Sequence, residues 1–452
     1  MVGLTFFEAF GNLNQDVKIH LKQAVWNYLR EVINMQIGQF SYLDNTLHCG
    51  PISIRDIISQ DGMGTPTYIY SEQRLLENCR MVRQAFPNAA IRYAVKACMN
   101  LSILRLLHQQ GFGFDVVSHG ELNRAKLAGA SGNEIVYAGA AKTNFEIQEA
   151  VQSGVTIVVE CPEELDVIDR VTKKLRRRVK VLLRLRPNVD AHTHQHLTTG
   201  AAFSKFGMPE KTVRAILDDW HRDLVQIFGI HFHIGSLIKE SESIAQATRV
   251  ALPVIDEYDL GELDIGGGFP VSYQADESVP SPAEFAKAVA NEIGDCKLKL
   301  LIEPGRMIVA DTAILVTQVM SKEFGVDEED EPWRIITCDA GMADLIRPML
   351  YGAIHQVWPV HLRDPIITPT YVAGPYCEST DFLARRVINL PKLSRHDLLA
   401  IMHAGAYGRS MASNYNGNLF GAEVLVTVDG EIIVIAHREP FGHSIELEDV
   451  RR

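Results

Sequence analysis

Short strand-like runs alternate with helical patterns from about residue 66 to residue 306, and no other feature constrains the fold as strongly. Helical patterns such as Glu121–Ala130 and Asn144–Ser153 lie between runs rich in strand-forming residues. The strand-like runs are Pro66–Tyr70, Ile91–Ala97, Phe114–Ser118, Ile135–Gly139, Thr156–Glu160, Lys180–Pro187, Ile227–Gly235, Glu262–Phe269 and Leu298–Arg306. This alternation is typical of βαβ units and a parallel sheet. About eight units over about 240 residues favour an α/β fold built as a closed (β/α)8 barrel over an open, doubly wound sheet.

Beyond Arg306 the pattern changes to strand-like segments separated by turns. We therefore predict a barrel over residues 73–310 and a C-terminal, mainly-β domain formed by residues 49–72 and 311–452. Residues 1–48 stand apart, because their apolar residues fall at helical spacing and predict an N-terminal helical extension. Packing against the chain's own body and docking to a partner both remain open for this extension.

Composition excludes several classes of protein. The net charge of -12 disfavours a nucleic-acid-binding surface, which needs clustered lysine and arginine. The sequence contains no apolar run of 18 residues, so we expect no membrane span. The N-terminus lacks the order of a signal peptide, and an odd number of cysteines, seven, does not suggest a disulfide framework. These features predict a cytoplasmic protein.

The segment IRYAVKACMN places Lys96 at the end of a buried strand. Lysine is rarely buried without a task, and the carboxyl ends of barrel strands are where catalytic residues gather. Desolvation would lower the pKa of this amine and prepare it for Schiff-base chemistry. Taken alone, Lys96 is equally compatible with a strand-end lysine that reaches solvent.

Three later strand ends add complementary chemistry. IHFHIGS places His231 and His233 on the same face of one strand; no third ligand at metal-site spacing accompanies them, and a flat imidazole could instead stack on a planar cofactor. The glycines of DIGGGFP (Asp264–Pro270) would let backbone N–H groups approach a phosphate. IEPGR (Ile302–Arg306) adds an acid and an arginine. Together with Lys96, these segments supply an amine, a ring stacker, a phosphate cradle and an acid for a pyridine nitrogen.

With these motifs and others, the chain resembles the fold-type III pyridoxal-phosphate decarboxylases, and most of all the diaminopimelate decarboxylase family. The resemblance extends from about residue 65 to about residue 440. The motifs that carry it are YAVKA, FDVVSHGEL (Phe114–Leu122), DAHTH (Asp190–His194), KFGM (Lys205–Met208), HFHIGS, GGGFP, EPGR, CDAGMADLIRPMLYGA (Cys338–Ala353), GPYCESTDFL (Gly374–Leu383) and GAYGRSMASNYN (Gly405–Asn416).

The resemblance implies pyridoxal 5'-phosphate as the cofactor and no metal. Lys96 would hold the cofactor through its amine, and His233 would stack on the ring. Glu303 would pair with the pyridinium nitrogen and keep it protonated. The other cofactor contacts would come from Asp115, Ser236, Gly266, Gly267, Gly268, Arg306 and Tyr407.

The resemblance also implies a homodimer with shared active sites. Cys377 and Glu378 would enter from the other subunit, where the Cys377 thiol would donate a proton after CO2 departs. Lys96, His233 and Cys377 would be the catalytic residues. A small amino acid would be the substrate, bound by Arg306, Arg347, Tyr351, Glu378 and Tyr407.

Within this family the arginines would bind a distal carboxylate and Glu378 a distal ammonium. The implied activity is decarboxylation of meso-2,6-diaminoheptanedioate to L-lysine and CO2. The alternatives are a related decarboxylase acting on D-ornithine, D-lysine or a substrate of specialised metabolism, and a non-catalytic regulatory homologue. For Arg347, the structural alternative is an ion pair at a domain interface.

Overall fold

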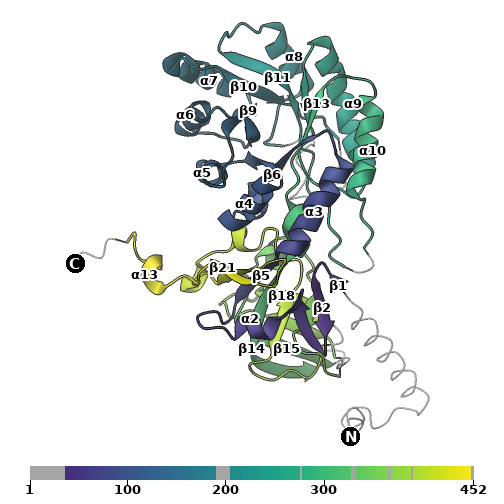
Figure 1. Cartoon of the computed structure of the whole chain (residues 1–452), viewed down its shortest axis with the longest axis vertical. Helices are drawn as coiled ribbons and strands as arrows, with labels where there is room; N and C mark the ends of the chain where they lie inside the picture. Colours follow the sequence, from purple (N-terminus) through teal and green to yellow (C-terminus); the bar gives the residue numbers. More distant parts are fainter. Residues whose placement is uncertain are drawn as a thin grey trace.

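The computed structural model describes residues 36–189, 204–274, 277–326, 332–364, 366, 368–387 and 390–448. It has two parts stacked along its longest axis, a barrel ringed by helices and a mainly-β domain (Figure 1). The amphipathic pattern that we predicted before residue 36 and the DAHTH motif lie outside these residues. Among the described residues, no helix is long and apolar enough to cross a bilayer.

Eight parallel strands form the closed barrel in the order of the chain, which confirms the predicted fold class. The strands are β6 (Ala90–Ala94), β7 (Gly113–Val116), β8 (Ile135–Tyr137), β9 (Thr156–Val159), β10 (Val179–Arg184), β11 (Val225–His231), β12 (Glu262–Asp264) and β13 (Lys299–Ile302). Helices cover the outside of the barrel (Figure 1): α3 (Glu72–Ala85), α4 (Leu101–Gln109), α5 (His119–Leu127), α6 (Asn144–Ser153), α7 (Pro162–Leu175), α8 (Glu210–Asp218), α9 (Ser241–Glu257) and α10 (Pro282–Ile293).

Local sequence determines where these helices begin and end. Helix α6 starts at a capping box, in which Thr143 and Glu146 satisfy each other's backbone N–H groups. It ends at Gly154, whose φ of 68° lies in the left-handed region that glycine tolerates best. Such signals keep the connections between strands and helices short and hold each strand end, with its polar residues, at the mouth of the barrel.

The second part is a nine-stranded sheet system. Its strands are β5 (Thr67–Ser71), β14 (Ala313–Val326), β15 (Pro332–Cys338), β16 (Val357–Pro359), β17 (Thr370–Ala373), β18 (Phe382–Val387), β19 (Leu398–Ile401), β20 (Ala422–Val426) and β21 (Ile432–Ala436). Strand β5 precedes the barrel in the chain, yet it lies between β14 and β20 in this sheet. The chain therefore passes between the two parts both before and after the barrel.

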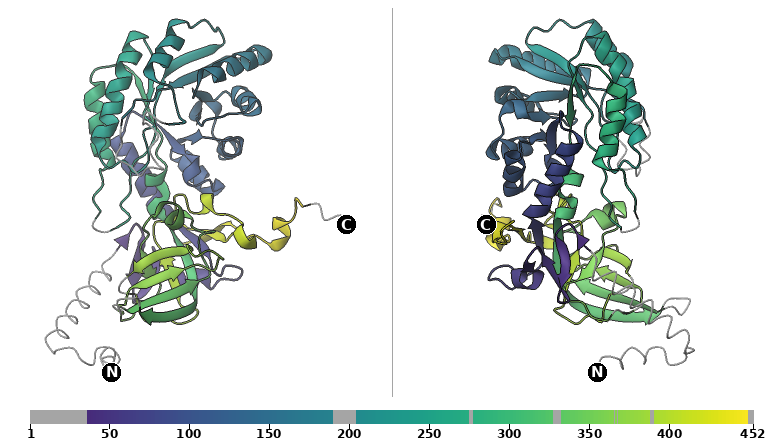
Figure 2. Two further views of the ribbon diagram at one scale, coloured as in Figure 1. Left: turned by 180° about the vertical axis from the view of Figure 1, so that it is seen from behind. Right: turned by 45° about the vertical axis from the view of Figure 1, so that its right-hand side comes forward.

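Helix α3 lies at the junction of the two parts (Figure 2). Its Asn78 side chain donates hydrogen bonds to the Ile308 carbonyl and to Asp311, where the chain leaves the barrel. Arg74 forms an ion pair with the same Asp311 at 2.7 Å. These contacts join helix α3 to the segment that leads from the barrel into the β domain.

The prediction that residues 1–48 form a helical extension is wrong for residues 36–48. These residues form β1 (Gln36–Ile37), β2 (Phe40–Leu43) and β3 (Thr46–Cys49), which join β4 (Ile52–Ser53) in a small antiparallel sheet. Asp44 and Asn45 both adopt positive φ, as a tight hairpin turn requires. Phe40 and Leu47 are fully buried in a cluster that also contains Trp358, so tertiary packing decides the structure of this segment.

Candidate active site

Lys96 lies in the short 3-10 turn η2 (Val95–Ala97) that follows β6, at the carboxyl end of the barrel. Its Nζ is 2.9 Å from Oδ2 of Asp115, which is fully buried on the neighbouring strand β7. The lysine side chain remains 37% exposed, so its amine is accessible from the barrel mouth. Lys96 therefore combines a buried counter-ion with access for a ligand.

The predicted direction of the Lys96 pKa shift is wrong. Burial lowers the pKa, but the carboxylate of Asp115 and the nearby Tyr407 and Glu303 raise it more, so the pKa lies above its ordinary value. The amine is accordingly a protonated ion-pair partner of Asp115. Oδ2 of Asp115 is the nearest carboxylate oxygen to this proton.

His233 and His231, at the end of β11, interact with different groups. Nδ1 of His233 accepts a hydrogen bond from the Gly267 N–H at 3.2 Å, which fixes the tautomer of the ring. Burial and the positive charge of Lys96 hold the pKa of His233 well below its usual value, so the ring is neutral. His231 instead contacts the carboxylate of Glu303, with Nε2 3.4 Å from Oε2.

The three glycines occupy positions where no other residue fits. Gly266 and Gly268 have φ values of 65° and 100°, in the left-handed region. A Cβ atom at Gly267 would lie 2.2 Å from the Glu303 carbonyl oxygen, and one at Gly268 would lie 2.3 Å from the Gly235 carbonyl oxygen. The glycines thus let this loop pack directly on the backbone of two neighbouring strand ends.

Two buried carboxyl groups lie side by side beneath this loop. Ligand-type atoms of His231, Asp264 and Glu303 all lie within 4.8 Å of one another. Oδ1 of Asp264 accepts the Gly266 N–H at 2.9 Å, which orients the first carboxyl group. Burial and the charge of Glu303 raise the pKa of Asp264 well above its usual range, so the pair retains a proton. Oε1 of Glu303 has no hydrogen-bond partner among the described residues.

Arg306 from the barrel and Arg347 from the β domain converge on one oxygen atom. Nη1 of Arg306 donates to the Tyr273 hydroxyl oxygen at 2.9 Å, and Nη1 of Arg347 donates to the same oxygen at 3.0 Å. Both arginine residues are buried, with exposures of 6% and 2%. Among the described residues, no carboxylate oxygen lies within 4.0 Å of either guanidinium group. The ion pair considered as the structural alternative for Arg347 is therefore not found there.

The remaining predicted contacts cluster around these arginines. Arg306 donates from Nη2 to the Ser236 hydroxyl at 3.1 Å, and its guanidinium lies 4.8 Å from the centre of the Tyr407 ring. The backbone N–H of Tyr407 bonds to the Ala97 carbonyl at 2.8 Å, which joins this C-terminal segment to the Lys96 turn. Tyr351 ends helix α12 (Arg347–Tyr351), close enough to Arg306 to influence its pKa.

Cys377 and Glu378 are exposed and have different surroundings. The backbone N–H of Cys377 bonds to Asn416, and the hydroxyl of Tyr415 donates to the Glu378 carboxylate. Within the part of the chain that the structure describes, no hydrogen bond or ion pair joins either residue to the barrel site. The structure therefore brings together the predicted barrel residues but leaves these two on the surface.

Comparisons with known proteins agree with this geometry. Residues 72–310 match the family described as "Pyridoxal-dependent decarboxylase, pyridoxal binding domain". A diaminopimelate decarboxylase of Aquifex aeolicus is 36% identical over 412 residues, which are 90% of this chain and 96% of the relative. One of Neisseria meningitidis serogroup B is 38% identical over 402 residues, covering 86% and 94%.

The chain belongs to the pyridoxal-dependent decarboxylase family. The crystal structure of a Helicobacter pylori diaminopimelate decarboxylase complexed with L-lysine superposes on it with a TM-score of 0.79 at 35% identity, covering 85% of this chain and 96% of the other. The predicted resemblance is thus confirmed, and with it the dependence on pyridoxal phosphate.

The residues of this decarboxylase fit pyridoxal phosphate. An accessible amine, a neutral imidazole and a buried carboxylate oxygen without a partner stand at adjacent strand ends, on Lys96, His233 and Glu303. The three consecutive glycines carry no side chains of their own, as close approach of a phosphate to their backbone N–H groups requires. The aldehyde, the ring face, the ring nitrogen and the phosphate of the cofactor therefore each have a matching group.

Sequence reasoning missed two residues of this decarboxylase site, Tyr273 and His355. Nε2 of His355 lies 2.9 Å from Nη1 of Arg347, and its Nδ1 lies 2.8 Å from the Met402 carbonyl, so the ring donates to the carbonyl and accepts from the arginine. Tyr273 follows the GGGFP motif by three residues, on the same loop after β12. Closeness to that motif was the available signal for Tyr273, whereas the sequence offered none for His355.

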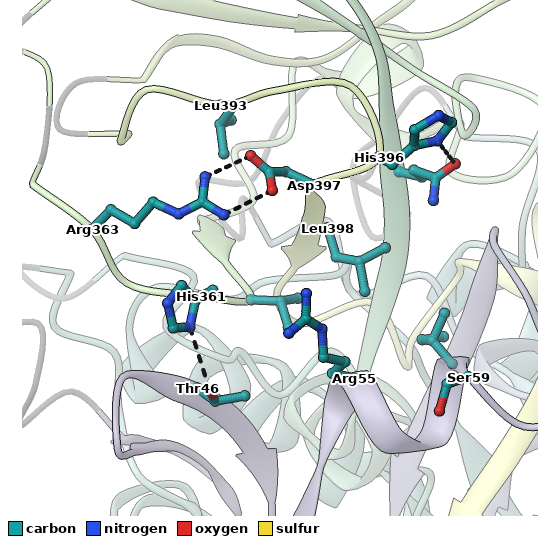
Figure 3. A pocket seen from close by; sticks show the side chains of 12 residues that line it. Thr46, Arg55, Ser59, His361, Arg363, Leu393, His396, Asp397 and Leu398 are labelled. Atoms are coloured by element: carbon teal, nitrogen blue, oxygen red, sulfur yellow. Dashed lines mark hydrogen bonds and ion pairs between the residues drawn. The ribbon is translucent and has the colours of Figure 1, made fainter.

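A hollow in the β domain gives a useful contrast (Figure 3). It has a volume of about 170 Å³ and is lined by residues that include Arg55, His361 and His396. There Arg363 binds Asp397 with both terminal nitrogens, at 2.8 and 2.9 Å. The charge of Arg363 is thus neutralised by a carboxylate of the same chain. Arg306 and Arg347, which meet at Tyr273, have no such partner among the described residues.

Proposed function

We propose that this enzyme decarboxylates meso-2,6-diaminoheptanedioate at its D-centre, giving L-lysine and CO2. The observation that carries the proposal is the convergence of Arg306 and Arg347, both buried, without a carboxylate among the described residues. Buried charges normally have partners, because an uncompensated one costs several kcal/mol. A substrate with a second carboxylate would supply the missing partner.

The names of the relatives support the same substrate, since those compared above are diaminopimelate decarboxylases. D-Lysine and D-ornithine have no second carboxylate and would leave both guanidinium groups unpaired. Structures of a Vibrio vulnificus lysine/ornithine decarboxylase are only 23–24% identical and share the fold. We therefore favour the dicarboxylate over the two diamino acids.

When bound, pyridoxal phosphate supplies an electron sink for the electrons of the breaking carbon–carboxylate bond. Lys96 would attach the cofactor, and Asp115 would take and return the lysine proton at Oδ2. His233 would present the flat face of its neutral ring, and Glu303 would accept the ring N–H at Oε1. Gly266, Gly267 and Gly268 would hold the phosphate together with Ser236, near Arg306 and Tyr407.

The two guanidinium groups, with Tyr351, would hold the distal carboxylate. Glu378 would accept hydrogen bonds from the distal ammonium group. The Cys377 thiol would donate its proton to the carbon that has lost CO2. Binding the substrate at its unreactive end leaves the reacting carboxylate free to be oriented at the cofactor.

The substrate proposal predicts the outcome of a CO2-release assay with a panel of amino acids. We expect kcat/KM for meso-diaminoheptanedioate to exceed the values for D-lysine, L-lysine, D-ornithine, L-ornithine and L-arginine by at least about a thousandfold, because buried polar groups left unpaired discriminate strongly. The LL isomer of diaminoheptanedioate, which lacks a D-centre, is the matched control. Equal or faster release from D-lysine or D-ornithine would contradict the substrate assignment but leave the decarboxylase intact.

We also propose that the active enzyme is a homodimer in which Cys377 and Glu378 complete the partner's site. Support comes from their exposure and from the absence of a hydrogen bond or ion pair to the barrel site of their own chain within the described ranges. A thiol that protonates a carbon must reach it, so an exposed Cys377 needs a second chain to cover it. A symmetric dimer would form both sites at once.

Mixing two inactive variants tests this arrangement. Lys96→Ala and Cys377→Ala proteins, mixed in equal amounts and allowed to exchange subunits, should recover about a quarter of wild-type activity, because half of the dimers would then carry one native site. Each variant incubated alone is the control. Exchange demonstrated by mass spectrometry without recovered activity would show that each chain builds its own site.

We further propose a cytoplasmic location. All seven cysteines are free, including the exposed Cys296 and Cys377. Reduced thiols are typical of proteins that work in a reducing compartment.

A further inference from the structure

The hydroxyl of Tyr273 stands at the centre of the two-arginine site. Its oxygen accepts Nη1 of Arg306 and Nη1 of Arg347 at nearly equal distances, 2.9 and 3.0 Å. These two bonds use both acceptor positions of a phenol oxygen. The phenolic proton has no acceptor among the described residues, because this oxygen only accepts hydrogen bonds there. Tyr273 therefore has one donor left for a ligand.

The ring of Tyr273 is held rigidly, with 7% exposure. Its centre lies 5.2 Å from the ring centres of both His355 and His403, and its carbonyl accepts a hydrogen bond from Gln356. Its backbone N–H bonds to Glu277. The ring belongs to the barrel, whereas these histidines and the glutamine belong to the β domain, so the hydroxyl is fixed from both sides of the junction.

We propose that Tyr273 is a specificity-determining residue for the second carboxylate of the substrate. Its oxygen holds the two guanidinium groups on either side of one point, and its proton is donated to the carboxylate that binds there. This inference rests on the proposed function, because it concerns the group that the two arginines would bind. The Tyr273 hydroxyl would add a neutral hydrogen-bond donor between the two guanidinium groups, both of which would bind the same carboxylate.

The electrostatic surroundings support this role. Burial raises the pKa of the Tyr273 phenol, but Arg306 and Arg347 lower it more, so the net pKa lies below its ordinary value. An acidic phenol flanked by two cations is a stronger hydrogen-bond donor to an anion than an isolated tyrosine. Without this oxygen, the two guanidinium groups would repel each other and lose their common orientation.

Binding of L-lysine and of cadaverine tests this inference without catalysis. L-Lysine, the product, retains the carboxylate that the two arginines would bind, and cadaverine is the same diamine without it. Titration calorimetry with the holoenzyme should show that Tyr273→Phe lowers the affinity for L-lysine at least about tenfold. The variant loses one hydrogen bond to the carboxylate, and the two guanidinium groups lose the oxygen that orients them. Cadaverine affinity should change less than about twofold, because the phenylalanine ring preserves the packing against both histidines.

Steady-state kinetics give a second readout. KM for meso-diaminoheptanedioate should rise in Tyr273→Phe, while kcat should stay within about threefold of wild type, since the reacting end of the substrate is untouched. Tyr258→Phe, which removes a hydroxyl bound to Asp218 on the far surface helix, is the matched control and should change neither value.

The outcomes separate this inference from the function on which it rests. If wild-type enzyme binds L-lysine no tighter than cadaverine, the two-arginine carboxylate site itself is wrong. If wild type prefers L-lysine and Tyr273→Phe preserves that preference, the tyrosine is not a specificity residue. Equal weakening of both ligands would assign Tyr273 a purely structural role and overturn the inference.

Discussion

Replacing Lys96 with arginine is expected to lower kcat/KM for decarboxylation by at least about 10⁴-fold, equivalent to roughly 5.5 kcal/mol of transition-state stabilisation. Arginine keeps a positive charge beside the buried Asp115 but cannot form the covalent bond to the cofactor. The visible absorption of the covalently attached cofactor should disappear together with activity. Absorption spectra and CO2 release, measured on the same preparation, check both effects.

Two further variants make the result interpretable. Lys96→Ala should lose as much activity and should also be less stable, because Asp115 is left as a buried group without its ion-pair partner. Lys211→Ala, on the exposed face of α8, should leave activity and spectrum unchanged. If Lys96→Arg kept both its activity and a covalently bound cofactor, Lys96 would not be the residue that attaches the cofactor.

The second large effect is expected at Arg347. Arg347→Ala should lower kcat/KM for meso-diaminoheptanedioate by at least about a hundredfold, roughly 2.7 kcal/mol, mainly through a higher KM. The variant lacks the guanidinium group that would bind the distal carboxylate through two hydrogen bonds. Activity toward D-lysine, which has no distal carboxylate, should stay equal or increase. Steady-state kinetics with both substrates measure the ratio directly.

Arg363→Ala is the matched control, because it removes the same side chain from the β domain at a site neutralised by Asp397. It should not alter the ratio between the two substrates. The melting temperature gives an independent check on Arg347. A buried charge without a counter-ion destabilises the fold, so its removal should not lower the melting temperature. A large fall in melting temperature in Arg347→Ala, with an unchanged substrate ratio, would make this arginine structural.

The sequence was sufficient to predict the barrel and which residues gather at its mouth. Strand ends carry Lys96, His233, the three glycines, Glu303 and Arg306, and parallel strands in a closed barrel must bring their carboxyl ends together. A residue's place in the alternation of strands and helices therefore already specifies its neighbours. Arg347 and Tyr407 were assigned through family resemblance, because their positions depend on how the β domain meets the barrel.

What the sequence could not predict depends on contacts between distant segments. The hairpin of residues 36–48 is stabilised by burial of Phe40 beside Trp358, more than 300 residues away in the chain. The raised pKa of Lys96 depends on Asp115 lying 2.9 Å away, a distance that no local pattern encodes. Tyr273 is likewise unremarkable until two arginines from different domains meet on its oxygen.

The position of β5 between β14 and β20 has a consequence for how the chain matures on the ribosome. This strand is synthesised before the barrel, but both strands that pair with it are synthesised afterwards. A nascent chain that has just completed the barrel thus carries β5 with two unpaired edges, the kind of surface that chaperones protect from aggregation. Arg347, which meets Arg306 at the Tyr273 hydroxyl, is also supplied by the β domain, so this cluster cannot form until that domain has been synthesised.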